Sequence, residues 1–285
     1  MFVRLAALLL FAAPAFAAPR LGAVLTVDPP RDAAHPARMA VIHVPVGGVA
    51  INGVAYLASG VGPHPTLIIA HGWPGNEKNL DLAQAVRRAG WNAVTFNYRG
   101  SWGSAGKFRF AQVPEDAAAV LAYLRGHAAE LGVDPRRLVL AGHSMGGWAT
   151  ALTAARDAGL AGAILISASD LGKVGTLARP AVVAGAAGNS ETLVTTPEIM
   201  ADELIASSAG FAITRAAPGL RAMPLLVLTS NDGLAPHSDA LVAAVRTTGG
   251  SAVTTRHVAT DHGWSDARLR LAGEVIDWLD RLPAR

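Results

Sequence analysis

The sequence predicts an α/β fold with a mainly parallel central sheet and helices on both faces. From residue 66 onward, short and wholly apolar runs alternate with longer helical stretches. Strands that are apolar on both faces and joined by helices are typical of a parallel sheet covered on both sides. The chain has 285 residues, of which 51% are hydrophobic and 16% charged, so it can bury one large core.

A hairpin is the first element of the predicted domain. Residues 39–46 and 49–57 are β-prone runs that flank Gly47 and Gly48, a pair suited to a two-residue hairpin turn. We therefore expect an antiparallel hairpin to open a domain that covers residues 39–285.

Strands and helices then alternate to the end of the chain. The predicted strands are residues 66–70, 91–97, 137–141, 163–167, 225–229 and 252–259. The predicted helices are residues 77–89, 114–125, 145–157, 236–247 and 265–282. Residues 168–221 interrupt this rhythm with a connection that is long for a compact domain and contains one predicted helix over 197–207. We expect this segment to form a small cap over the carboxyl edge of the sheet.

The first residues have the pattern of a targeting segment. Arg4 precedes an apolar stretch over residues 5–11, and residues 15–17 form a small-x-small cleavage motif. The apolar stretch is shorter than the roughly 20 residues that span a bilayer. We expect residues 1–17 to be a cleavable signal peptide, residues 18–38 to be an extended lead-in, and the mature protein to be periplasmic or secreted with no stable membrane span.

Composition excludes several classes of function. The chain has no cysteine, which removes disulfides, thiolate metal sites and cysteine nucleophiles. Its net charge of +3 is spread along the chain, so no nucleic-acid partner is expected. No His-Glu-x-x-His spacing and no dinucleotide fingerprint occur, so neither a metal nor a cofactor is expected.

The clearest catalytic motif is the segment GHSMGG at residues 142–147, which follows a predicted strand and opens a predicted helix. A serine between glycines at such a junction lies on a tight, strained turn that exposes its hydroxyl. The N–H groups at the start of the helix can stabilise a developing oxyanion. We predict that Ser144 is a nucleophile; the alternative is a capping serine at a glycine-rich helix start.

A second motif, HGWPG at residues 71–75, directly follows the predicted strand 66–70. In this architecture the loop after that strand supplies one oxyanion donor, and the residue after the nucleophile supplies the other. We assign these donors to the backbone N–H groups of Trp73 and Met145. His71 is expected to hold the loop by a hydrogen bond.

Together with the segments NYRGS at 97–101 and DHGW at 261–264, these motifs resemble those of the α/β-hydrolase superfamily. The similarity is to its esterase and serine-peptidase branches, which include prolyl-oligopeptidase-like and serine aminopeptidase-like enzymes. It extends from about residue 50 to the end of the chain. The resemblance implies the α/β-hydrolase fold and a serine hydrolase reaction, but not a substrate, because these motifs recur across many specificities.

A serine hydroxyl needs a neighbouring imidazole as general base. His262 follows the last predicted strand and precedes the last predicted helix, where the resemblance places the catalytic histidine. His237 is the alternative. His257 is expected to pack or to face solvent within its strand, and His143 is interpreted as the variable neighbour of the nucleophile.

The acid that orients the histidine is predicted to be Asp232. It follows the predicted strand 225–229 and gives the chain order Ser, Asp, His that this fold uses. The alternatives are Asp239 and Asp170, in which case Asp232 is a plain turn residue. Asp261 is expected to shape its own loop or to cap the final helix.

Charged residues outside the triad have a structural and a functional interpretation. Arg99 is expected to pair with a carboxylate, although its loop borders the predicted pocket. The acidic residues of the predicted cap are interpreted as a solvated helix start, with binding of a substrate α-amino group as the alternative. These acids are Glu191, Glu198, Asp202 and Glu203.

The sequence therefore predicts two-step acyl transfer on a small carboxylic ester, because the predicted cap is short and apolar and no extra domain is present to select peptides. The alternative is a serine peptidase, of the aminopeptidase or dipeptidyl-peptidase type, acting on short peptides with the same residues. A non-catalytic binding protein and an acyltransferase are further hypotheses.

Overall fold

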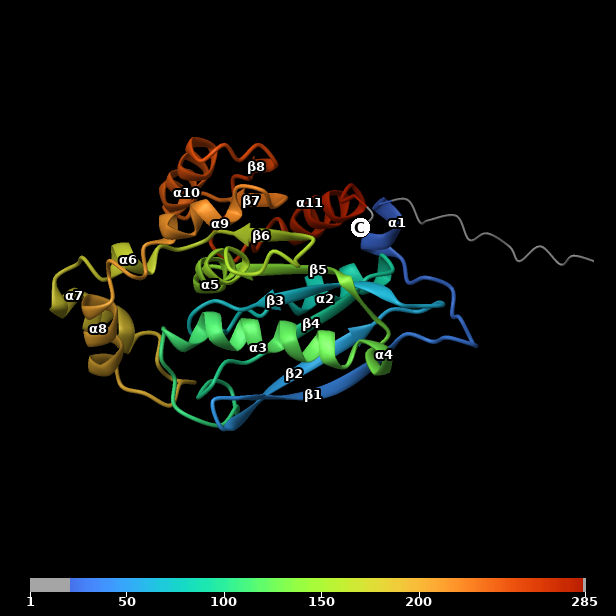
Figure 1. The fold of residues 1–285 in the computed structure, drawn as a ribbon, viewed down its shortest axis with the longest axis horizontal. Coiled ribbons are helices and arrows are strands. Elements are labelled where there is room, and N and C mark those ends of the chain that lie inside the picture. Colours follow the sequence, from blue (N-terminus) through green and yellow to red (C-terminus); the bar gives the residue numbers. More distant parts are fainter. Residues whose placement is uncertain (1–20, 284–285) are drawn as a thin grey trace, which may run out of the picture.

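The computed structural model describes residues 21–283, so the predicted signal peptide lies outside the described residues. An eight-stranded sheet with the order β1-β2-β4-β3-β5-β6-β7-β8 runs through the domain (Figure 1). The β1–β2 and β2–β4 pairs are antiparallel, and all other pairs are parallel. The predicted fold class, a mainly parallel sheet opened by an antiparallel hairpin, is confirmed.

The core elements lie close to their predicted positions. The strands are β1 Arg38–Val46, β2 Val49–Leu57, β3 His64–Ala70, β4 Asn92–Phe96, β5 Val133–His143, β6 Gly162–Ile166, β7 Leu225–Thr229 and β8 Val253–His257. The helices outside the β6–β7 connection are α1 Leu21–Thr26, α2 Leu80–Arg88, α3 Gln112–Gly126, α4 Ala128–Leu131, α5 Met145–Ala154, α10 Ala235–Thr247 and α11 Arg268–Asp280. Strand β5 starts earlier than predicted because Val133 pairs with His64 across a register shift.

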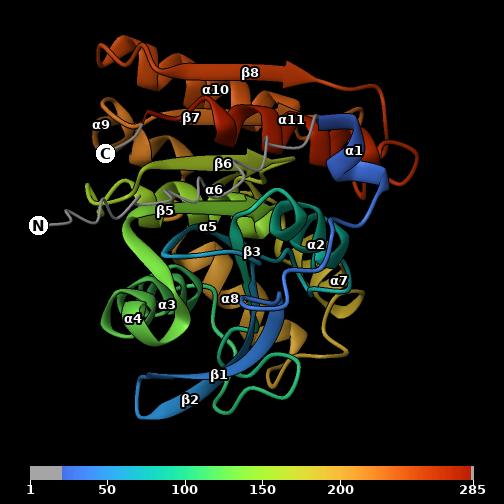
Figure 2. The same cartoon turned by 90° about the vertical axis from the view of Figure 1, so that its right-hand side faces the viewer.

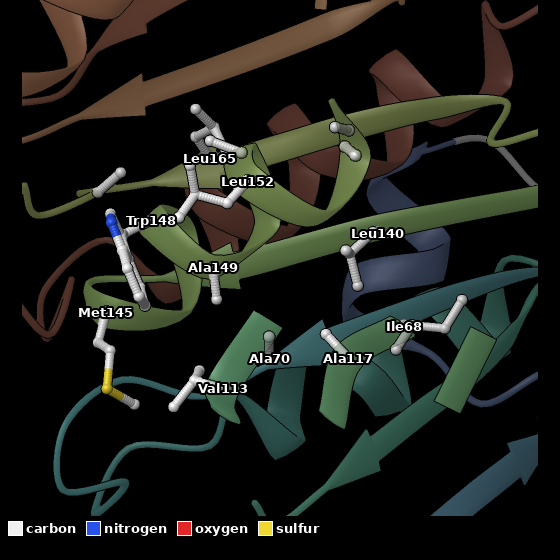
Figure 3. Packing of buried hydrophobic residues seen from close by; sticks show 14 of the residues in the cluster. Ile68, Ala70, Val113, Ala117, Leu140, Met145, Trp148, Ala149, Leu152 and Leu165 are labelled. Atoms are coloured by element: carbon white, nitrogen blue, oxygen red, sulfur yellow. The ribbon is translucent and has the colours of Figure 1, made fainter. Parts of the chain in front are cut away.

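Helices cover both faces of the sheet. Helices α3, α5 and α10 pack on one face in a large apolar cluster. Helices α2 and α11 pack on the other face in a second cluster, and Figure 2 shows α3 and α2 on opposite sides of the sheet. Figure 3 shows how Ala149 and Leu152 of α5 meet side chains of α3 and of the strands. Every residue of the central strands β4, β6 and β7 is buried, which explains their continuous apolar runs.

The lead-in, expected to be extended, contains the short helix α1. Val24 is buried in the cluster that α2 and α11 form, and its carbonyl accepts a hydrogen bond of 2.9 Å from Arg88 Nε. Six residues make too short a stretch for a periodic signal, so tertiary contacts determine this helix.

The connection between β6 and β7, here called the β6–β7 insertion (residues 167–224), lies beyond the carboxyl ends of the parallel strands (Figure 1). Only α8 was expected, and it is found at Pro197–Ala206, with the Thr196 side chain accepting a hydrogen bond from Ile199 N. The insertion also contains α6 Leu171–Val174, α7 Arg179–Ala187, a 3₁₀ helix Ile213–Ala216 and α9 Ala217–Leu220.

Helix α7 was missed because its sequence has no apolar period, with only Val182 and Ala186 buried. Among the described residues, no helix combines the length and the apolar character needed to cross a bilayer.

Candidate active site

Ser144 lies at the sharp turn between β5 and α5, with φ 57° and ψ −119°. A positive φ at a residue with a side chain is uncommon and persists only where the surroundings impose it. Here the surroundings are backbone: a Cβ at Gly142 would overlap the Gly146 carbonyl, and a Cβ at Gly146 would overlap the carbonyl of Ala70. Only glycine lets α5 approach β3 and β5 this closely, which leaves Ser144 partly exposed at the tip of the turn.

The HGWPG loop lies directly against this turn. A Cβ at Gly72 would be 3.1 Å from Ser144 Cβ. Within residues 21–283, neither the N–H of Trp73 nor that of Met145 donates a hydrogen bond. Two unused donors therefore come from the segments that flank Ser144, one from the loop and one from the first residue of α5.

His71 holds the HGWPG loop, as expected. Its Nδ1–H donates to the Gly72 carbonyl at 2.7 Å, and the Tyr98 hydroxyl donates to the His71 carbonyl at 2.9 Å. Burial lowers the pKa of the His71 ring to about 4, so the ring is neutral at neutral pH. On the outer side of the loop, Trp102 Nε1 donates to the Pro74 carbonyl at 2.9 Å.

Asp232 and His262 are in direct contact, with 2.7 Å between His262 Nδ1 and Asp232 Oδ2. The Asp232 side chain is 3% exposed and that of His262 is 42% exposed. Burial raises the pKa of the Asp232 carboxyl, but hydrogen bonds from His262, the Leu234 N–H and two serine hydroxyls bring it below its ordinary value. The carboxylate therefore stays ionised and can fix the tautomer of the imidazole.

His143, interpreted from sequence as a variable neighbour, connects the serine turn to the histidine loop. Its Nε2–H donates to the His262 carbonyl at 2.8 Å, and the two rings are 4.6 Å apart. Burial and the nearby His262 ring lower the pKa of His143 to about 4. This bond brings the backbone of His262 next to the residue that precedes Ser144. Among the described residues no hydrogen bond joins Ser144 Oγ to His262, a contact that in enzymes often forms only with substrate bound.

Arg268, which lies in none of the sequence motifs, holds the other side of the histidine loop. Its guanidinium donates to the Gly263 carbonyl at 2.9 Å and to Asn79 Oδ1 at 3.0 Å, and it pairs with Asp81. It thereby links the loop that carries His262 to the start of α2. A basic residue at the first position of α11 is unfavourable for the helix dipole, and this was the available sequence signal.

The alternative acid and base are used elsewhere. His237 Nδ1 accepts a hydrogen bond of 3.2 Å from the backbone N–H of Asp170. One Asp170 oxygen accepts from the N–H of Gly172 at 2.9 Å and from that of Ile213 at 3.1 Å. Asp170 therefore caps α6 and holds the end of the β6–β7 insertion.

The remaining alternatives also hold turns or face solvent. Asp261 accepts from the backbone N–H of Ser265 at 2.8 Å, which shapes its loop as expected. His257 is exposed and contacts Asn231 at 2.9 Å, and Asp239 is exposed on α10.

Arg99 pairs with a carboxylate, as expected. Its side chain is bound by the buried Asp116 and by Glu115 on α3. This ion pair fixes the glycine-rich loop that contacts the β6–β7 insertion through the hydrogen bond of 2.7 Å from Val194 N to the Gly100 carbonyl.

The acids of the insertion have partners of their own. Glu203 accepts from the backbone N–H groups of Phe110 and Ala111 at 3.0 and 2.9 Å, just before α3 begins. Asp202 pairs with Arg179 at 2.8 Å.

Glu191 accepts from Asn76 Nδ2 at 3.2 Å, one residue after the HGWPG loop, and Glu198 is exposed in the first turn of α8. Across residues 21–283, no group of three metal-ligating side chains is placed to hold a metal ion.

A sequence model described as alpha/beta hydrolase fold matches residues 75–266, more than half of the chain. No curated protein sequence matches the chain. Among solved structures, the carboxylesterase EstE1 from a metagenomic library is similar, with TM-score 0.65, 22% identity and 93% of each chain covered.

The Pyrobaculum calidifontis esterase aligns with TM-score 0.66 and 18% identity, over 91% of this chain and 87% of that one. The Pyrococcus horikoshii acylaminoacyl peptidase aligns with TM-score 0.68 and 15% identity, over 86% of this chain and 42% of the peptidase. At these identities the structures establish the fold, and with the match to the family they show that the chain belongs to the alpha/beta hydrolase fold family.

Proposed function

We propose that this hydrolase is a serine carboxylesterase that uses Ser144, His262 and Asp232 as its catalytic triad. The observation that carries the proposal is the convergence of three segments at one edge of the sheet. The first segment is the strained turn of Ser144, and the second is the loop that holds an unused N–H against this serine. The third carries a histidine that is bonded to an ionised aspartate.

The chemistry follows from these positions. His262 takes the proton of Ser144 Oγ as the oxygen attacks the ester carbonyl, and the N–H groups of Trp73 and Met145 donate to the resulting oxyanion. The imidazolium, stabilised by Asp232, gives that proton to the leaving alkoxide as the acyl–oxygen bond breaks. His262 then deprotonates a water that attacks the acyl-enzyme and releases the carboxylic acid and free Ser144.

An ester is favoured over a peptide because two of the four acids of the β6–β7 insertion are engaged. Glu203 is bound to two backbone N–H groups, and Asp202 is bound to Arg179. A peptidase that recognises a free α-amino group needs an available carboxylate in the pocket. We propose that the insertion acts as an apolar cap over the bound acyl group.

Fluorophosphonate labelling tests the triad. Wild-type protein should label, Ser144→Ala should not, and His262→Ala should label far more slowly. With p-nitrophenyl acyl esters, kcat of Ser144→Ala should fall by about 10⁶. Ser251→Ala, a matched change at an exposed serine, should keep full labelling and activity. Labelling that persists in Ser144→Ala would remove the proposal, and a wild type that never labels would favour a binding protein.

One observation favours the peptidase alternative. Glu191 lies beside Asn76, immediately after the loop that carries Trp73, and its carboxylate is exposed. If aminoacyl p-nitroanilides are cleaved faster than esters, and Glu191→Gln raises KM for the free-amine substrate without changing kcat, the peptidase assignment replaces the esterase. Glu198→Gln is the control, because Glu198 is exposed elsewhere on the insertion.

We also propose export, with cleavage between Ala17 and Ala18. N-terminal sequencing of protein recovered from outside the cytoplasm should begin at Ala18. Ala17→Arg should leave the precursor uncleaved. An extracytoplasmic protein that starts at Met1 would contradict this proposal.

A further inference from the structure

A groove runs between β1 and α2, on the opposite face of the hairpin from α3. On the face of the hairpin toward α3, residues such as Ile42, Val44 and Ile51 are buried. The other face leaves Met39 65% and Val41 71% exposed. Figure 2 shows the hairpin at one edge of the sheet. Two hollows of about 490 and 360 Å³ follow this face of β1.

The register of the sheet arranges the groove floor in rows. Met39 lies opposite Tyr56, Val41 opposite Val54, and His43 opposite Asn52. Because alternate residues of a strand share a face, the floor passes from apolar rows to a polar row. The four residue-to-residue steps from Met39 to His43 give a floor about 13 Å long.

Helix α2 forms the wall of the groove. Leu80, Gln84 and Arg87 line it and share one face of the helix. Leu80, 46% exposed, lies above the apolar rows. The wall is therefore apolar at Leu80, beside Lys78, and polar at Gln84 and Arg87.

Lys78 closes the polar end. Its Nζ donates to Asn97 Oδ1 at 2.9 Å and is 4.0 Å from the centroid of the Trp102 ring. Within residues 21–283, no carboxylate pairs with this ammonium, and burial lowers the pKa of Lys78. A half-buried cation whose partners are neutral has lost hydration without gaining a counter-charge, which favours a bound anion.

Charge along the groove has one sign. The hollow of about 360 Å³ is lined by Lys78 together with Val41 and Leu80, the separate hollow of about 490 Å³ is lined by Arg38 and Arg87, and neither lining includes an aspartate or glutamate. An occupant that complements this surface has an apolar body and an anionic group.

We propose that the groove binds a medium-chain fatty acid, with its alkyl chain over Val41 and Leu80 and its carboxylate on Lys78. This site is separate from the Ser144 turn, and the proposal does not depend on the hydrolysis proposed above. The apolar rows accommodate the chain, and the ammonium with the neighbouring Asn97 and Asn52 side chains receives the head group.

Calorimetric titration of the full chain with octanoate, and with octanol as the uncharged analogue, tests the proposal. Octanoate should bind saturably and at least tenfold more tightly than octanol, because only octanoate makes a charge-assisted hydrogen bond with Lys78. Lys78→Gln should weaken octanoate about tenfold and remove the preference over octanol. Val41→Asp should abolish binding at this site.

Matched controls are Lys107→Gln and Val61→Asp, which change an exposed lysine and a valine that is 80% exposed, both outside the groove. Both should bind octanoate like wild type, and far-UV circular dichroism should show all four variants folded. If octanoate does not bind wild type, or if Lys78→Gln and Val41→Asp bind it as tightly as their controls do, the groove is not a fatty-acid site.

Discussion

Helices α5 and α7 are built from similar residues and have opposite surroundings. The α5 sequence MGGWATALTA and the α7 sequence RPAVVAGAA are both short and rich in alanine and glycine. All ten residues of α5 are buried, whereas only Val182 and Ala186 of α7 are. In α5, glycines allow contact of backbone with backbone, while α7 reaches α8 through the Arg179–Asp202 ion pair on the surface. Composition alone therefore does not separate a helix that supports the serine turn from one at the periphery.

If Asp232 acts as proposed beside the serine turn, the largest expected difference is between this aspartate and Asp202, the partner of α7. Asp232→Asn should lower kcat by about 10⁴, because an amide cannot hold the His262 tautomer that accepts the serine proton. Asp202→Asn removes an exposed partner of α7 and should leave kcat and the thermal midpoint unchanged. Ester turnover and thermal melts of both variants check this. Equal losses in the two variants would show that the distinction between the regions is wrong.

Matched glycine substitutions come next. Gly146→Ala places a methyl group against the carbonyl oxygens of Ala70 and His71, so the chain must shift, which should lower the free energy of unfolding by about 3 kcal/mol. Gly185→Ala adds a methyl group in open space on α7 and should raise it by about 0.5–1 kcal/mol. Urea denaturation measures both values. A neutral Gly146→Ala would contradict the close packing of α5.

Acid should weaken the region around α5 first. The rings of His71 and His143 have pKa values of about 4 in the folded protein, against 6.5 for an ordinary histidine. Between pH 6.5 and 4 the unfolded chain binds protons that the folded chain does not, so stability falls as pH falls, by about 3 kcal/mol for each ring.

Urea denaturation at pH 7, 5 and 4 measures this slope. His143→Gln keeps an N–H donor for the His262 carbonyl and removes one titrating ring, so its slope should be shallower than that of wild type. The β6–β7 insertion contains no histidine, and hydrogen exchange should show it responding later than the serine turn. An unchanged slope in His143→Gln would contradict the buried neutral ring.

The smallest effect concerns the bond that joins α5 to the insertion. Trp148 Nε1 donates to the Phe211 carbonyl at 2.6 Å in a buried setting. Trp148→Phe removes one of two hydrogen bonds to that carbonyl, which also accepts from Gly172 N at 3.2 Å, and should lower the free energy of unfolding by about 1 kcal/mol. The free energy of unfolding of Val182→Phe, which changes an apolar side chain of α7 within the insertion, serves as the comparison. A Trp148→Phe variant as stable as wild type would show that the insertion does not depend on this bond.

The sequence was sufficient for the features that depend on local pattern. Apolar runs revealed the strands because the central strands are buried on both faces, and the GHSMGG and HGWPG motifs marked the turn and the loop that the structure places against each other. Helix α8 lies where it was predicted, and the Thr196 side chain caps its start.

Features that depend on contacts across the fold could not be found in this way. The bond from His143 to the His262 carbonyl joins residues 119 positions apart, and that from Arg268 to Asn79 joins residues 189 apart. Nothing near either residue in the chain indicates its partner. The prediction of helix α7 failed for a related reason. Its two buried residues contact α8, and they do not recur at a helical spacing in the sequence.

The separation of His143 from His262 has a consequence for biosynthesis. The serine turn is complete once β3, β5 and α5 have been synthesised, but the histidine loop follows β8, the last strand. Domains generally fold as units, and this sheet lacks a strand until β8 has been made. Under the proposed mechanism, a nascent chain that ends before residue 262 has the proposed nucleophile without its proposed base, so it should not hydrolyse an ester.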